Sequence, residues 1–286
     1  MKRYQMMRFP EGRAKAVTLS YDDGCLADRR LAEIIDRYGI KCTFNLNSNH
    51  LMWSIEKNGD FHKDFLANGH EVAVHGKFHK APGRLRAVEG IRDVLYCREE
   101  LENHYDMIIR GMAYPDSGIR AISNGVSYES IKHYLCDLGI VYARTLGNDN
   151  DSFELPTDWY AWMPSTKHTN PKIMDYIDKF LNWDLSQNAY CAARFPKLFY
   201  MWGHAYEFDN DNNWDLLEEI CKKLGNRDDI WYATNIEIYD YVTAYNSLIY
   251  SADGNTIYNP TLVTLYFDDA ENSYVIKPGE TLKIKV

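Results

Sequence analysis

The sequence contains two short runs of residue types that commonly bind metal ions. Asp22 and Asp23 are adjacent, and His75 and His79 lie four residues apart. Two imidazoles and one carboxylate give a divalent cation three protein ligands and leave room for a water molecule, as in hydrolytic rather than structural metal sites. The second carboxylate of the acidic pair would then be free to accept a proton. These residues predict a metal site with a general base beside it.

Each of the two runs follows a predicted β-strand. The segment 16–21 is rich in strand-forming residues and leads to Asp22, and the segment 26–38 after it has apolar residues at helical spacing. The segment 70–74 is a second predicted strand, and it ends at His75. Because chemistry collects at the carboxyl ends of the strands in α/β folds, we expect both runs to meet at that edge.

The motifs SYDDG and HGKFH around these residues resemble the first two motifs of the polysaccharide deacetylases, the NodB-homology carbohydrate esterases of family 4. In that family the first aspartate is the catalytic base, and the second aspartate and both histidines bind the metal. The resemblance implies that Asp22 is the base and that Asp23, His75 and His79 are the metal ligands. Such donors suit zinc best, although they also accept cobalt, nickel or iron.

The third motif of that family is a turn whose backbone amide helps to hold the oxyanion of the reaction. The segment 112–118 is similar to it and follows a predicted strand at 107–111, but Asp116 stands where an aromatic residue is usual. The resemblance implies that the Asp116 amide is the oxyanion donor, because such donors act through a preorganised N–H group whatever the side chain is. It also places Tyr114 and Pro115 as substrate contacts.

The family further places an arginine against the base and a histidine acid after an apolar strand. Arg144, at the carboxyl end of the predicted strand 140–144, is favoured over Arg110 as the arginine that orients the base. The apolar run 198–203 leads to His204, and the resemblance makes this residue the general acid. An imidazole suits that role because its ordinary pKa of about 6.5 lies near working pH.

An aromatic segment lies where the fourth family motif would be. Trp159 and Trp162 belong to the segment 153–162, and His168 follows it closely. Aromatic side chains at the mouth of a site stack on sugar rings, so we interpret the two tryptophans as candidate substrate contacts. The alternative is that they only anchor the loop. For His168 the two interpretations are a place in the pocket wall and an exposed place on a loop.

The order of the predicted elements indicates one α/β catalytic domain with a small appendage. The predicted strands begin near residues 15, 41, 71, 107, 140, 198 and 230. Helices separate them, which favours a parallel sheet and agrees with the distorted (β/α)7-type barrel that the resemblance implies. Only short strands and turns follow residue 245. We therefore expect a catalytic domain at 1–245 and a small all-β appendage at 246–286.

Composition limits the compartment and the partners. The 286 residues include 32 Lys and Arg against 41 Asp and Glu, and the net charge of −9 disfavours nucleic acid and anionic membranes. No apolar run of about 18 residues predicts a membrane span. The first ten residues lack the apolar stretch of a signal peptide. Six cysteines without a CxxC pair are typical of free thiols in a reducing compartment, so we expect a cytoplasmic protein.

These observations predict a metal-dependent hydrolase that removes acetyl groups from a carbohydrate. A cytoplasmic location favours the N-acetyl group of an amino-sugar oligosaccharide or glycoconjugate over a cell-wall polymer. Two alternatives stay open: a relative that hydrolyses a non-sugar C–N bond, such as a cyclic imide or ureide, and a carbohydrate-binding relative without catalysis. The first kind often lacks the metal ligands, and the second is expected to lack the base, a ligand or the acid. The sequence leaves the oligomeric state open.

Overall fold

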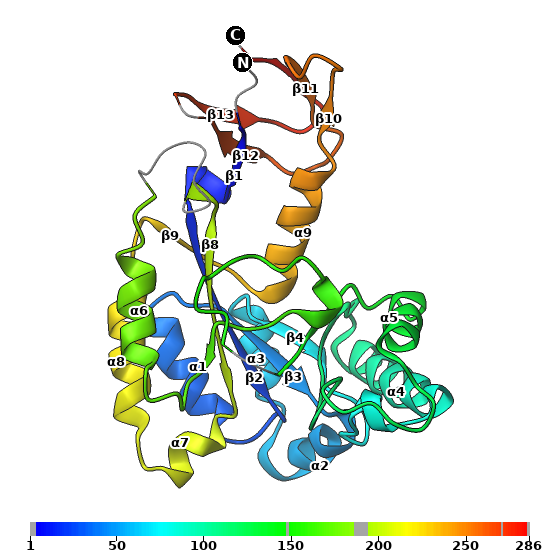
Figure 1. Ribbon diagram of the computed structural model, residues 1–286. Helices are drawn as coiled ribbons and strands as arrows, with labels where there is room; N and C mark the ends of the chain where they lie inside the picture. The colour runs from blue at the N-terminus through cyan, green and yellow to red at the C-terminus, as the bar shows by residue number, and fades with distance from the viewer. Residues whose placement is uncertain (1–3, 147–148, 186–193, 270, 285–286) are drawn as a thin grey trace.

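A parallel β-sheet with helices packed on its outer side forms the main body of the protein (Figure 1). The computed structural model describes residues 4–146, 149–185, 194–269 and 271–284. The strands of this sheet are β2 Lys15–Asp22, β3 Cys42–Leu46, β4 Glu71–Val74, β5 Gly111–Ala113, β6 Tyr142–Arg144, β7 Thr166–Lys167, β8 Lys197–Gly203 and β9 Ile230–Tyr232. Their order is β6-β5-β4-β3-β2-β8-β7, with β9 also paired to β2, and every pair is parallel.

The sheet curves into a half-barrel, which confirms the predicted (β/α)7-type fold. Strand β2 is central because β8 pairs with it over Lys15–Tyr21. On its other edge β9 pairs with the first half of β2 and β3 with the second half. Asp22 therefore lies in the middle of the carboxyl edge of the sheet.

Nine α-helices and three short 3-10 helices connect the strands in the part of the chain that the structure describes. The α-helices are α1 Asp28–Arg37, α2 Ser48–Asn58, α3 His62–Ala67, α4 Ala87–Tyr105, α5 Tyr128–Asp137, α6 Ile173–Leu181, α7 Tyr206–Asn210, α8 Trp214–Leu224 and α9 Asn235–Asn246. The 3-10 helices are η1 Pro10–Gly12, η2 Pro82–Arg84 and η3 Trp159–Ala161. The strand expected at 107–111 begins only at Gly111, because the preceding residues form the connection that leaves α4.

Two small antiparallel sheets form the appendage at one end of the half-barrel (Figure 1). Their strands are β1 Met6–Arg8, β10 Ile249–Tyr250, β11 Thr256–Tyr258, β12 Leu265–Asp268, β13 Ser273–Ile276 and β14 Thr281–Lys283. One sheet has the order β1-β12-β13, so it takes a strand from the N-terminal region. Arg8 Nε donates to Asp268 at 2.7 Å, and the Tyr241 hydroxyl of α9 donates to the Arg8 carbonyl at 2.6 Å. A division of the chain at residue 245 stays a prediction.

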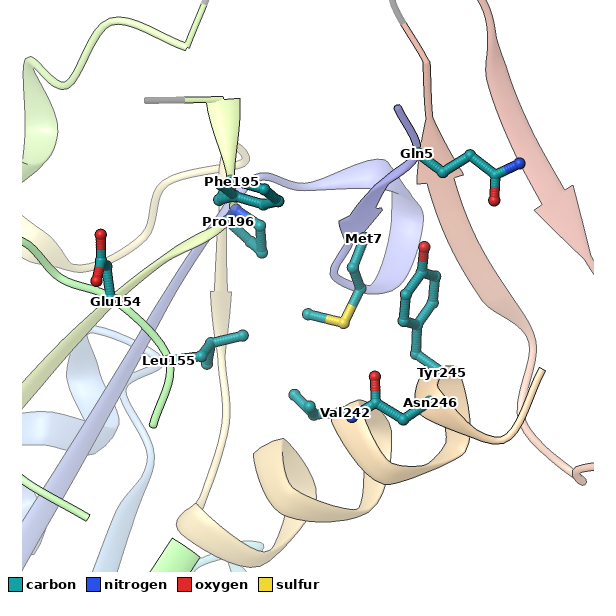
Figure 2. A pocket seen from close by; sticks show the side chains of 9 residues that line it. All are labelled: Gln5, Met7, Glu154, Leu155, Phe195, Pro196, Val242, Tyr245 and Asn246. Atoms are coloured by element: carbon teal, nitrogen blue, oxygen red, sulfur yellow. The ribbon is translucent and has the colours of Figure 1, made fainter. Parts of the chain in front are cut away.

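A pocket of about 420 Å³ lies where β1, α9 and the start of β8 meet (Figure 2). Its apolar lining residues are Met7, Leu155, Phe195, Pro196, Val242 and Tyr245. Because it opens at the amino end of β8, it is separated by the length of that strand from His204 and from the carboxyl edge of the sheet.

A buried carboxylate joins the half-barrel to α9. Glu71 on β4 accepts hydrogen bonds from the Thr43 hydroxyl at 2.8 Å, the Tyr142 hydroxyl at 2.7 Å and the Ile236 amide at 2.9 Å. The last bond satisfies a free N–H group at the first turn of α9. Burial raises the pKa of Glu71 to about 7, although these three donors oppose the shift.

We expect Glu71→Gln to remove part of the pH dependence of stability. Since the folded pKa of about 7 lies above the ordinary value of 4.5, the folded protein keeps a proton that the unfolded chain releases between these values. The free energy of unfolding therefore falls as pH rises through about 7, by up to about 3 kcal/mol. The free energy of unfolding, measured with denaturant, should fall more between pH 5 and pH 8 in wild type than in E71Q. The control is E99Q, because Glu99 is exposed, and it should show the same fall as wild type. Equal falls in all three proteins would contradict this expectation.

Candidate metal and acid-base site

Asp23, His75 and His79 converge at the carboxyl edge of the sheet. Each offers one donor atom, and the three atoms lie within 4.8 Å of one another. His79 Nε2 is 3.3 Å and His75 Nε2 is 3.6 Å from Asp23 Oδ1. Two imidazole nitrogens and a carboxylate oxygen are a donor set that zinc and its neighbours in the first transition row accept. The three predicted ligands therefore fit a divalent cation.

His75 is held in the orientation that a metal ligand needs. It is buried just after β4, and its Nδ1–H donates to the Ala113 carbonyl at 2.9 Å. This bond fixes the tautomer and leaves the lone pair of Nε2 directed at Asp23. Burial lowers the pKa of His75 against the opposing effect of Asp22 and Asp23, so the ring stays neutral and available as a donor.

Asp22 lies beside the three ligands at the end of β2 and is 2% exposed. Arg144 Nη2 donates to its Oδ2 at 2.5 Å, and Asn45 Nδ2 donates to its Oδ1 at 2.9 Å. Burial alone would raise the pKa of Asp22, but Arg144, His75 and His204 outweigh it and hold the pKa below the ordinary value. The carboxylate is therefore ionised and able to accept a proton.

The structure distinguishes between the two arginines considered from the sequence. Arg144 is fully buried at the end of β6 and pairs with Asp22, and its guanidinium lies 4.6 Å from the Trp202 ring centroid. Arg110 instead pairs with Asp240 of α9 through two hydrogen bonds at the surface. Of the two, only Arg144 contacts Asp22 and is placed to orient it.

His204 follows β8 and faces the same carboxylates. Its Nε2 is 4.0 Å from Asp22 Oδ2 and 3.8 Å from Asp23 Oδ2, while its Nδ1 lies 3.4 Å from Glu207 Oε2. Burial alone would lower the pKa of His204, but Glu207, Asp22 and Asp23 raise it above its ordinary value. These carboxylates therefore favour the protonated form of His204, which can donate a proton.

Glu207 is a site residue that the sequence analysis missed. It accepts a hydrogen bond from the His204 amide at 3.2 Å and pairs with Lys167, and these partners hold its pKa at about 2 despite burial. His168 is buried rather than exposed, with Nε2 3.4 Å from Glu207 and Nδ1 3.2 Å from the Tyr21 hydroxyl. The available signal was a glutamate three residues after His204, a spacing that brings two side chains of one helical turn together.

Asp116 is exposed on the turn after β5 and has a left-handed backbone with φ of 50°. Among the hydrogen bonds of the described residues, none uses the Asp116 amide, so this N–H is free to bind an oxyanion. Pro115 next to it is buried close to Gly76. The placement agrees with the predicted backbone donor, whose role stays a prediction.

Three of the nine described non-glycine residues with positive φ lie at this site. Asp23, His79 and Asp116 have φ of 79°, 53° and 50°, a region that residues with a Cβ atom rarely adopt. Such conformations cost of order 1 kcal/mol each and persist where the surroundings enforce them, often at functional sites. The two metal-ligand candidates and the oxyanion-donor candidate therefore depend on neighbouring elements for their position.

Tyr114 does not lie at the site surface, contrary to the prediction that it contacts substrate. Its side chain is 1% exposed, and its hydroxyl donates to the Tyr160 carbonyl at 2.9 Å. The reason is that the residue packs inward after β5, where its ring joins the hydrophobic core. Pro115, although buried, remains adjacent to the histidine loop.

Trp162 belongs to the core rather than to the site, and Trp159 is partly buried against it. Trp162 is 1% exposed and packs edge-on against Tyr142 and Tyr200. Trp159 packs against Trp162 and against Tyr239 of α9. The burial of Trp162 contradicts its predicted substrate contact and agrees with the alternative, that it anchors the loop. A substrate contact of Trp159 stays a prediction.

Comparisons with known proteins relate this fold to the polysaccharide deacetylases. Residues 10–128 match the family model of the polysaccharide deacetylases. The resemblance to this family is therefore confirmed. The matched part contains Asp22, Asp23, His75 and His79 and ends before Arg144 and His204. No curated protein matches the chain.

Two of the solved structures compared, with TM-scores of 0.50 or more, agree with the fold. A protein from Mycobacterium smegmatis assigned as a polysaccharide deacetylase is 18% identical, with a TM-score of 0.57 over 86% of this chain and 96% of that one. BA3943 from Bacillus anthracis, a family 4 carbohydrate esterase pseudoenzyme, is 14% identical, with a TM-score of 0.50 over 82% and 68%. A family 4 acetyl xylan esterase from Clostridium thermocellum, in complex with a cobalt ion, is 13% identical, with a TM-score of 0.47 over 79% and 90%.

Proposed function

We propose that this protein is a metal-dependent deacetylase that hydrolyses an acetyl group on a carbohydrate, with the N-acetyl group of an amino sugar as the favoured target. One observation carries the proposal: a buried ionised aspartate, a histidine that nearby carboxylates favour in its protonated form, and three metal-ligand candidates face one another. Asp22 and His204 approach to 4.0 Å, and both lie beside the cluster of Asp23, His75 and His79. A relative that had become inactive because its catalytic residues were replaced would lack at least one of these groups.

The chain's own residues divide the reaction between them. A divalent cation, most suitably zinc, would polarise the acyl oxygen and make a water molecule more acidic. Asp22, held ionised by Arg144, accepts the proton of the attacking water. The Asp116 amide donates to the oxyanion that forms on the acyl carbon. His204 then gives its Nε2 proton to the leaving nitrogen or oxygen.

A cleft of about 440 Å³ beside the ligands can hold the sugar. Its lining residues are Asp23, Cys25, Asn47, His50, His79 and Tyr206. The Tyr206 ring is 37% exposed and lies 5.2 Å from the His204 ring, so it offers an aromatic face next to the acid. No lysine or arginine lines the described cleft, which favours a neutral or cationic substrate over an anionic one.

Two other functions remain as alternatives. A hydrolase of cyclic imides or ureides could use the same base and acid, and the complete ligand set argues against it. A binding protein without catalysis would not need the raised pKa of His204.

Several features bear on the compartment without deciding it. The five described cysteines are free, and Cys191 lies outside the described residues. No helix in the described ranges has the length and apolar character needed to cross a membrane. A cytoplasmic location stays a prediction.

The test is acetate release by protein stripped of metal and then supplied with zinc or cobalt. N-acetylglucosamine oligomers and an O-acetylated xylan oligomer would be offered in parallel. We expect no acetate release without metal and a return of release when metal is added. The substrate that reacts faster would show whether the enzyme prefers an N-acetyl or an O-acetyl bond. Metal binding without acetate release from any sugar would contradict the substrate proposal and favour the C–N hydrolase alternative, while absence of metal binding would contradict the mechanism.

A further inference from the structure

The loop that carries the two histidine ligands is held mainly through its backbone. Between His75 and His79, the Phe78 side chain is 54% exposed and the Lys77 side chain is half-buried. Packing of these side chains into the core therefore contributes little to the shape of the loop. Two hydrogen bonds do more: the Lys77 amide donates to the Asp93 carbonyl at 3.1 Å, and the Phe78 amide donates to Asp93 Oδ1 at 2.7 Å.

Asp93 is well suited to brace this loop from α4. The residue is 5% exposed, and its carboxylate also accepts from the Lys80 amide, so it binds the backbone on both sides of His79. A buried carboxylate without a cationic partner is costly unless backbone donors satisfy it. The amides of the histidine loop are the donors that satisfy this carboxylate.

Gly76 shows how closely the loop fits against Asp93. This glycine has φ of 73°, and a Cβ atom built on it would lie 2.4 Å from Asp93 Oδ2. Only a residue without a side chain allows the loop backbone to approach the carboxylate at that distance. The glycine and the aspartate therefore act as one fitted contact.

The two histidines differ in how much they depend on this contact. His75 has its own fixed partner, the Ala113 carbonyl. The His79 side chain is 38% exposed and its backbone is left-handed. Among the described residues, its ring forms an ion pair only with Asp23, and it lies edge-on against the His75 ring at 4.9 Å. The position of His79 must then come from the backbone around it, which Asp93 holds.

We infer that Asp93 is a positioning residue that sets the place of His79 and thereby the metal affinity of the site. The inference rests on the proposed metal site but not on the proposed substrate. Groups that orient metal ligands from behind typically change metal affinity by about 10- to 100-fold when they are replaced. We expect an effect of this size on zinc binding.

The experiment measures the zinc Kd of the folded, metal-free protein by competition with a chromophoric chelator. D93L keeps the branched shape of the side chain, with larger terminal groups, but accepts no hydrogen bond, and D93N keeps one acceptor oxygen. The matched control is E99A, which removes an exposed carboxylate from the same helix. We expect D93L to bind zinc about 10- to 100-fold more weakly than E99A, and D93N to fall between them.

A double-mutant cycle with H79A separates positioning from a general loss of structure. Once His79 is absent, D93L should cause no further loss of zinc affinity, because the ligand on which Asp93 acts is gone. Equal affinities of D93L and E99A would overturn the inference, and so would an undiminished effect of D93L in the H79A background. If D93L does not fold, as judged by circular dichroism, equal affinities of D93N and E99A would overturn it.

The outcome also separates this inference from the proposed function. Zinc binding by wild type together with an effect of D93L supports the role of Asp93 even if no sugar releases acetate. A wild-type protein that binds no zinc overturns both the metal site and the role of Asp93.

Discussion

Asp22→Asn should lower acetate release by about 10²- to 10⁴-fold while the metal ligands stay in place. Asparagine has nearly the same shape and can still accept a hydrogen bond from Arg144, but it cannot take a proton from water. The pKa of Asp22 is held below its ordinary value by Arg144 and the nearby histidines against the effect of burial. The base is thus ionised throughout the neutral range, and its removal cannot be offset by raising the pH.

The matched control for this variant is Asp116→Asn. Both changes replace an aspartate by an amide at the same edge of the sheet, but Asp116 is proposed to act through its backbone N–H, which the substitution keeps. We expect D116N to retain activity within about threefold of wild type, as is usual for exposed positions away from side-chain contacts. Comparable losses in D22N and D116N would contradict the assignment of the base.

Stability has to be measured beside activity in D22N. Arg144 is fully buried, and the substitution leaves its guanidinium without a counter-charge. Breaking a buried pair in this way costs about 3–5 kcal/mol in typical cases. We therefore expect a lower Tm for D22N, and the kinetic comparison should be made at a temperature where both proteins are folded.

His204→Gln should show the second large effect, and its size should depend on the leaving group. An amine or sugar hydroxyl needs a proton to depart, so we expect a loss of about 10²- to 10⁴-fold on an N-acetyl sugar. An aryl acetate releases a stable phenolate, so the loss on that substrate should be within about tenfold. The matched control is H133Q, because His133 is exposed on α5. Equal losses on both substrates would show that His204 is not the acid.

The pH profile gives an independent check on His204. Burial opposes its charge, but Glu207, Asp22 and Asp23 raise the pKa of this histidine above its ordinary value. The acid is active while protonated, so wild-type activity on the N-acetyl substrate should fall as pH rises through that raised pKa. In H204Q this fall in activity at alkaline pH should disappear. If the variant shows the same fall at the same pH, a group other than His204 causes it.

Much of this site was predictable because it follows the ends of strands with clear sequence patterns. The strand before Asp22 and the strand before His75 were both identifiable from alternation and turn signals, and the parallel order of the sheet brings their ends together. The strand β8 Lys197–Gly203 coincides with the apolar run 198–203 identified from the sequence, and helices separate the strands as predicted. Local patterns of this strength are seldom overridden by tertiary contacts.

The errors arose where side-chain direction decides the role. Tyr114 and Trp162 stand near the site in the sequence, but a change of one residue in register turns a side chain from the site into the core. No signal in the sequence shows whether these side chains point to the site or to the core. Likewise Asp93 and Asn45 touch the site from separate elements, and no spacing along the chain connects them with the residues that they hold.

The order of the site residues along the chain has a consequence for assembly. All three metal-ligand candidates come from the first 79 residues, on strands that pair with one another through β3. Arg144 and His204 arrive later, and His204 reaches Asp22 only when β8 adds to the far edge of β2. Long-range pairings of this kind form slowly. The groups that orient the two histidines, Asp93 and the Ala113 carbonyl, also precede Arg144 and His204 in the chain. We therefore expect metal binding to require only the part of the fold that ends at β5, whereas turnover also requires β6 and β8. An assay of metal content would then count incompletely folded chains that an assay of catalysis excludes.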